Sequence, residues 1–192
     1  MYLVLKEMKI WVEFLFDTDG VLEDDYAAKD SRYFDQFYTW LNSRRTLFSE
    51  HALSEYLEPV ISIFIRVVSA KKLYDMNQNS SSVFGKLGRI ASQGGMIALM
   101  PEFVKQRKML DGLIDIFANQ LRERLADGDV DFVFKSLQAD VKNCDNSQIV
   151  NGFYAIKKRY NDLQFQQMQG IISHDNFFLE SNRIGNSLLS FI

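Results

Sequence analysis

The segment Phe103 to Asp129, FVKQRKMLDGLIDIFANQLRERLADGD, decides the fold class of this chain. Its leucine, isoleucine and phenylalanine residues recur at spacings of three and four, which places them on one face of an α-helix. The helix is expected to end at Asp127-Gly128, because glycine readily takes the left-handed conformation that closes helices. Asp129 is then positioned to cap a following helix. The pattern predicts a long amphipathic helix followed directly by a second one.

The same periodicity continues on both sides of this segment. Further apolar helix faces run over Phe34 to Leu41, Leu53 to Val68, Val130 to Val141, Phe153 to Leu163 and Phe177 to Leu188. Ser49 is predicted to cap the second of these helices and Ser173 the last. The chain of 192 residues contains only two prolines, so there are few positions at which a helix must kink or end. The start, Tyr2 to Phe16, mixes aromatic and β-branched residues, so it could be either a helix or a strand.

A polar run from Asn77 to Ser82, followed by Gly85, Gly88, Gly94 and Gly95, is predicted to be the loosest part of the chain. The predicted fold is therefore all-α, a helical bundle in two parts. Residues 1–114 would form one helical domain. Residues 115–192 would form a small domain of three or four helices. In it, Gly170 would end the helix that precedes the final helix.

Composition excludes several classes of protein. A net charge of -3 gives no general attraction to nucleic acid or to an anionic membrane. Cys144 is the single cysteine, so an intramolecular disulfide is impossible, and a reducing, cytoplasmic setting is expected. His51 and His174 lie far apart in the chain, and we expect no metal site and no cofactor. Charges interrupt every apolar stretch, so no membrane segment is expected.

Three short motifs near the C-terminus are informative together: RYNDL (159–163), GIIS (170–173) and ESNRI (180–184). This combination resembles the eleventh type of effector-associated domain, found in bacterial conflict systems. The preceding segment from Leu121 to Leu137, with its Gly-Asp turn, is similar to the opening helix pair of that family. The resemblance covers about Phe117 to Ile192 and does not extend to the first 110 or so residues.

The resemblance implies a small helical adaptor that joins immune components by contacts between like domains, with no chemistry of its own. The partner would be another protein with a cognate domain, such as a protease, an NTPase or another effector; whether the chain also forms a homo-oligomer stays open. The candidate partner-binding residues are Arg159, Asn161, Asp162, Glu180, Asn182 and Arg183. The alternative is that the charged members form ion pairs that lock the hairpin. Tyr160 and Ile184 are expected in the core, and Ile171 and Ile172 are expected to pack the turn.

One competing motif is LFDTDGVL (15–22), which is similar to the first motif of the haloacid dehalogenase phosphatases. By that resemblance, Asp17 would be the nucleophile and Asp19 the acid/base of a Mg²⁺-dependent phosphatase. That fold requires alternating strands and helices, whereas the later sequence is predicted to be helical. We therefore do not expect an enzyme.

A second competing feature is a basic segment, which carries eight basic and two acidic residues between Arg66 and Lys108. The basic residues are Arg66, Lys71, Lys72, Lys86, Arg89, Lys105, Arg107 and Lys108. They could bind nucleic acid phosphates, although the nearby glycines match no phosphate-loop spacing. An acidic partner protein, or the acidic first thirty residues of this chain, could equally neutralise these positive charges. Nucleic acid is not the favoured partner.

Overall fold

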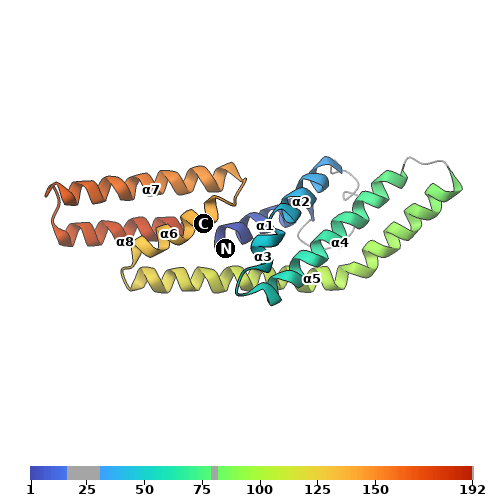
Figure 1. Cartoon of the computed structure of the whole chain (residues 1–192), viewed down its shortest axis with the longest axis horizontal. Coiled ribbons are helices and arrows are strands. Elements are labelled where there is room, and N and C mark those ends of the chain that lie inside the picture. The colour runs from blue at the N-terminus through green and yellow to red at the C-terminus, as the bar shows by residue number, and fades with distance from the viewer. Residues whose placement is uncertain (17–30, 79–81, 192) are drawn as a thin grey trace. The chain divides into compact units, whose positions relative to one another are not determined.

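A computed structural model describes residues 1–16, 31–78 and 82–191, and the regular structure in these ranges is α-helix without any strand. The all-α prediction is confirmed (Figure 1). The helices in the described ranges are α1 (Tyr2–Leu15), α2 (Ser31–Ser43), α3 (Arg45–Ser49), α4 (Ser54–Gln78), α5 (Val83–Ala126), α6 (Val130–Val141), α7 (Ser147–Met168) and α8 (His174–Phe191).

The chain divides into two compact units. The terminal unit comprises Met1–Met8 and Leu113–Ile192, and the middle unit comprises Lys9–Gly112. Helices α1 and α5 contribute to both, because each unit boundary falls inside one of them. The domain division predicted between residues 114 and 115 stays a prediction.

Aromatic side chains form the core of the middle unit. Phe16, which follows α1, packs against Phe34 of α2 and Phe103 of α5, with ring centroids 5.9 and 4.8 Å apart. Phe64 of α4 contacts the Phe103 ring at 5.5 Å and the Phe37 ring at 6.4 Å. All five side chains are buried. Burying so much aromatic surface holds the four helical segments together, because each such side chain removes a large apolar area from water.

The core of the terminal unit lies between α6, α7 and α8, with α7 and α8 running side by side as a hairpin (Figure 1). The rings of Phe134 and Tyr160 are stacked, with centroids 4.7 Å apart. Helix α8 also packs tightly on the end of α5, since a Cβ atom at Gly185 would lie 2.7 Å from a methyl group of Leu125. The absence of a side chain at Gly185 therefore permits this close approach.

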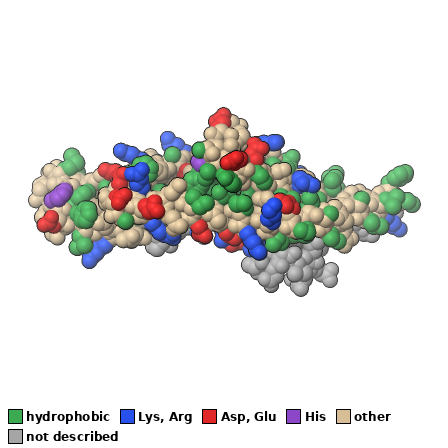
Figure 2. All heavy atoms as spheres, turned by 90° about the horizontal axis from the view of Figure 1, so that it is seen from below, with side chains coloured by type: hydrophobic (Ala, Val, Ile, Leu, Met, Phe, Trp, Pro, Cys, Tyr) green, Lys and Arg blue, Asp and Glu red, His purple; other side chains and the backbone are tan. Residues whose placement is uncertain are grey.

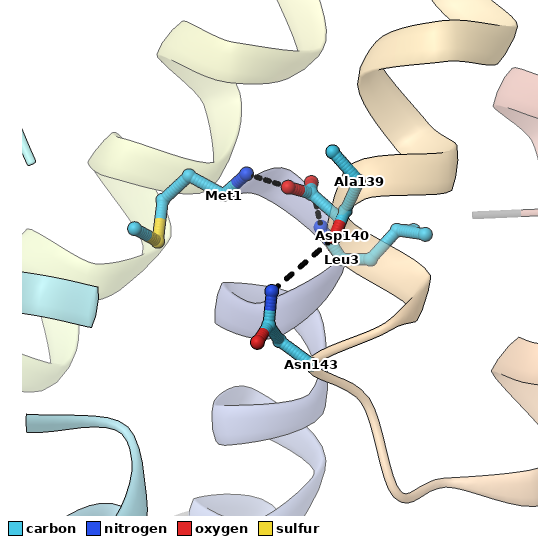
Figure 3. A network of polar contacts seen from close by, with 5 residues as sticks. All are labelled: Met1, Leu3, Ala139, Asp140 and Asn143. Atoms are coloured by element: carbon cyan, nitrogen blue, oxygen red, sulfur yellow. Dashed lines mark hydrogen bonds and ion pairs between the residues drawn. The ribbon is translucent and has the colours of Figure 1, made fainter. Parts of the chain in front are cut away.

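The first half of α1 is anchored in the terminal unit by two carboxylates. The backbone N–H of Leu3 donates a hydrogen bond of 3.1 Å to Asp140, which also forms an ion pair with the amino group of Met1 (Figure 3). Glu7, itself buried, accepts the backbone N–H of Asp145 at 3.0 and 3.1 Å from its two oxygens. Asp140 thus serves as an N-terminal cap for a helix that is distant in sequence.

Three local predictions need correction or completion. The start of the chain, open to either structure, is the helix α1. Ser49 does not cap the helix after it but is the last residue of α3, and α4 begins at Ser54. The glycine-rich segment predicted to be loose is helical from Val83 onward. A helix tolerates each internal glycine at a cost of about 1 kcal/mol, so glycines weaken a helix without ending it.

Candidate partner-binding surface

The α7–α8 hairpin is defined by local signals at its ends. Asn146 caps α7 by accepting the backbone N–H of Gln148 at 3.0 Å. Gly170, with φ +69°, ends that helix, and Ser173 accepts the backbone N–H of Asn176 at 3.3 Å at the start of α8. The roles predicted for Gly170 and Ser173 are confirmed. Each satisfies or redirects backbone groups that a helix end leaves without partners.

The inner face of the hairpin is core, as predicted for Tyr160 and Ile184, both of which are 5 % exposed. The Tyr160 hydroxyl donates to a carboxylate oxygen of Asp131 on α6, at 3.1 Å. Burial, reinforced by the negative charge of Asp131, raises the pKa of Tyr160 to about 12. These two residues therefore position α7 and α8 and are not available to a partner.

The three candidate residues on α7 are exposed but lie on two sides of the helix. Gln164 on one flank of α7 contacts Asp131 of α6. By helical spacing from the buried stripe of α7, Arg159 lies on the opposite flank, and Asn161 and Asp162 both lie away from the core, Asp162 toward Arg159 and Asn161 toward Gln164. Arg159 and Asp162, three residues apart on the helix, are therefore neighbours on its surface, whereas Asn161 lies on the other side.

On α8 the candidate residues divide in the same way. Glu180 and Arg183 form an ion pair of 2.6 Å on one side of α8, whereas Asn182, which is partly buried, lies on the other side. Both partners of this ion pair belong to α8, so the pair does not lock the hairpin. An exposed pair of this kind contributes about 0–1 kcal/mol to stability.

Large apolar side chains are exposed where α7 and α8 meet. Phe165, Met168, Ile171 and Leu179 have exposed fractions of 59, 82, 68 and 52 %. Figure 2 shows hydrophobic side chains at this end of the hairpin, on the left. The prediction that Ile171 packs the turn is wrong, because the turn carries this side chain outward. Phe165 could have been recognised, since it lies half a helical turn away from the buried stripe.

The basic residues of the middle unit do not form one continuous surface. Lys71 is 1 % exposed and pairs with Asp75, so it cannot reach a nucleic acid. Lys72 pairs with Asp35 at 2.6 Å, and Lys105 contacts Glu102 at 3.8 Å.

Arg66, Lys86 and Lys108 are exposed, Arg107 is partly buried, and the side chain of Arg89 lies outside the described part. Three of the eight basic residues, Lys71, Lys72 and Lys105, thus pair with carboxylates of the middle unit.

The phosphatase motif cannot be placed, because Asp17 and Asp19 lie outside the described residues. Within the ranges that are described, no cluster of three or more histidine, cysteine or carboxylate side chains could hold a metal ion. No helix in those ranges is long and apolar enough to cross a membrane. The terminal unit has a cavity of about 520 Å³, whose lining includes Tyr2, Arg124 and Phe132. Within this lining, the guanidinium of Arg124 contacts the Phe132 ring, with its central carbon 4.8 Å from the ring centre.

No curated protein and no solved structure matches this chain. One family model does match part of it, and this part coincides with α6, α7, α8 and the end of α5. The predicted resemblance from residue 117 onward is thereby confirmed: residues 116–192 match the model of the family described as effector-associated domain 11.

Proposed function

We propose that this chain is a non-catalytic adaptor of a bacterial, antiviral defence system. The terminal unit would bind a cognate effector-associated domain on another protein, such as a protease or an NTPase, and the middle unit would bind a second component. The match of residues 116–192 to effector-associated domain 11 carries this proposal, because it covers most of the terminal unit.

The outer side of the α7–α8 hairpin is the surface we propose for this contact. Phe165, Met168 and Ile171 would form its apolar centre, since exposed apolar side chains gathered in one place are typical of binding sites. Asn161 is exposed and Asn182 is partly exposed, and both amides can exchange hydrogen bonds with a partner.

The flanks of the hairpin would select the partner by charge. Arg159 and Asp162 border the surface on α7, and the Glu180–Arg183 pair borders it on α8. Charges at the rim of an interface act more on partner choice and association rate than on affinity. Reversing them should therefore change which proteins are bound without disturbing the fold.

The test exchanges the two charges of the α8 ion pair in the full chain, by Glu180→Arg together with Arg183→Glu. This double variant keeps an attractive pair at the same spacing, so its thermal unfolding should match that of the wild type. Tagged proteins expressed in the native host are captured, and the bound proteins are quantified by mass spectrometry. We expect a protein with an effector-associated domain to be captured by the wild type and lost from the variant.

Two further variants make the test decisive. Met168→Ser removes the most exposed apolar side chain of the surface and should also abolish capture. Lys135→Glu changes an exposed charge on α6 of the same unit and should leave capture unchanged. If the charge exchange and Met168→Ser both retain the partner while remaining folded, the hairpin surface is not the binding site.

A further inference from the structure

Helix α5 carries a continuous exposed stripe inside the middle unit. Its members are Val83, Leu87, Ile90, Gly94, Ile97, Pro101 and Val104. Successive members are alternately four and three residues apart, an average of about 3.5, which is the spacing of a helix face that packs against another helix. Figure 2 shows hydrophobic side chains at the right, over the beginning of α5. This α5 stripe is a packing face without an intramolecular partner in the described residues.

The centre of the α5 stripe is open. Apart from its chain neighbours and its own helix backbone, a Cβ atom at Gly94 or Gly95 would meet no atom of the described residues within 4 Å. Glycine inside a helix costs about 1 kcal/mol relative to alanine, and nothing within the described part of the chain uses the space that these two glycines leave. A second helix could therefore approach the stripe closely at this point.

The two ends of the α5 stripe have complementary shapes. Phe84, at the beginning, is 86 % exposed. Beyond the glycines, on the same face, lies a shallow groove of about 540 Å³, lined by Pro101, Val104, Lys105, Lys108, Met109 and Gly112. A protruding ring and a groove thus lie on either side of the open centre.

We propose that the α5 stripe binds the same stripe of a second copy of this chain, in antiparallel orientation. A two-fold axis near Gly94 and Gly95 places Phe84 of each copy at the groove of the other, which makes a closed, self-complementary contact over about 32 Å of helix. The charges favour this orientation. In a parallel pair, Lys105 and Lys108 of one copy would lie opposite the same lysines of the other copy, which repel them. In the antiparallel pair they lie near the Phe84 ring of the other copy, and the face of an aromatic ring attracts cations.

This pairing involves the middle unit and does not depend on the proposed function of the terminal unit. The first test is sedimentation equilibrium of the full chain, for which we expect a reversible dimer. Ile97→Glu introduces a charge twice into the two-fold contact and should raise the dimer Kd at least about 100-fold. Ile116→Glu is the matched control, because Ile116 is an isoleucine of similar exposure on the same helix but outside the stripe. Its Kd should equal that of the wild type.

Orientation is tested by cross-linking with a short bis-maleimide. Val83→Cys and Lys108→Cys are made in separate chains, and wild type, whose Cys144 is buried, serves as the background control. The antiparallel pair predicts that a mixture of the two variants is cross-linked and that neither variant is cross-linked alone. Cross-linking of each variant to itself would overturn the antiparallel arrangement.

The proposal is also overturned if the wild type stays monomeric, or if Ile97→Glu leaves the dimer intact. A monomer that co-sediments with phosphatidylglycerol vesicles would assign the stripe to a membrane surface instead. Circular dichroism of each variant checks that helix content is unchanged, so that loss of the dimer cannot be attributed to unfolding.

Discussion

Replacing Tyr160 by phenylalanine tests whether the hydroxyl of this buried side chain stabilises the terminal unit. The variant keeps the ring that stacks on Phe134 and removes the hydrogen bond of 3.1 Å to Asp131. A hydrogen bond of this kind contributes about 1 kcal/mol to the free energy of unfolding. Near neutral pH, Tyr160→Phe should therefore be less stable than the wild type by about that amount.

The stability difference should then decrease at high pH. In the unfolded chain the tyrosine pKa is about 10, and in the folded chain that of Tyr160 is about 12. A raised pKa means that folding favours the protonated phenol, so this contribution is complete below about pH 10 and is lost as the pH rises toward 12. At about pH 11 the free energy of unfolding of the wild type should have fallen by about 1.4 kcal/mol through this ionisation. The phenylalanine variant has no hydroxyl at this position and cannot show this loss.

Urea unfolding of both proteins near pH 8 and near pH 11 measures this change. The advantage of the wild type should fall from about 1 kcal/mol to about zero. All other tyrosines are shared by the two proteins, so their ionisation cancels in the difference. A stability difference that is the same at both pH values would refute the burial and the hydrogen bond assigned to Tyr160.

Two other substitutions test the turns and the anchor of α1. Gly170→Ala should cost about 1 kcal/mol of stability because the residue has φ +69° and no neighbour within 4 Å. Gly128→Ala should cost more in the same urea assay, since its φ is +79° and its Cβ would also lie 3.1 Å from Phe178; equal costs would contradict this contact. Asp140→Ala should cost about 1–2 kcal/mol and speed hydrogen exchange at the Leu3 amide, which loses its acceptor; unchanged exchange there would exclude the capping role.

Most of the predictions that the structure confirms depended on neighbours in sequence. Gly128 and Gly170 take positive φ at helix ends, and Asp129 accepts the Phe132 N–H at 3.2 Å at the start of α6. Caps, turns and helical periodicity involve residues within four positions of each other. The same reasoning identified Tyr160 and the segment from residue 117 onward, because the family motifs are themselves short.

Apart from the cap assigned to Ser49 and the glycine-rich segment, the errors concern which apolar and charged side chains are covered by other elements. Isoleucine is usually found in the core, but Ile171 is exposed. Lysine is usually found at the surface, but Lys71 is buried beside Asp75. Nor could periodicity show that the stripe beginning at Val83 lacks a partner among the described residues. An apolar face predicts that something should cover it, without saying what does.

The sequence by itself determined that the chain is helical, where several of its helices end, and that about its last two fifths resemble a known domain. Tertiary structure alone decided that the first residues of α1 belong with that domain, held by Asp140 and Glu7, and that the α7–α8 turn exposes apolar side chains. The physical reason is range. Backbone hydrogen bonds within a helix link residues four apart, whereas burial and the bonds of these carboxylates join residues more than a hundred positions apart.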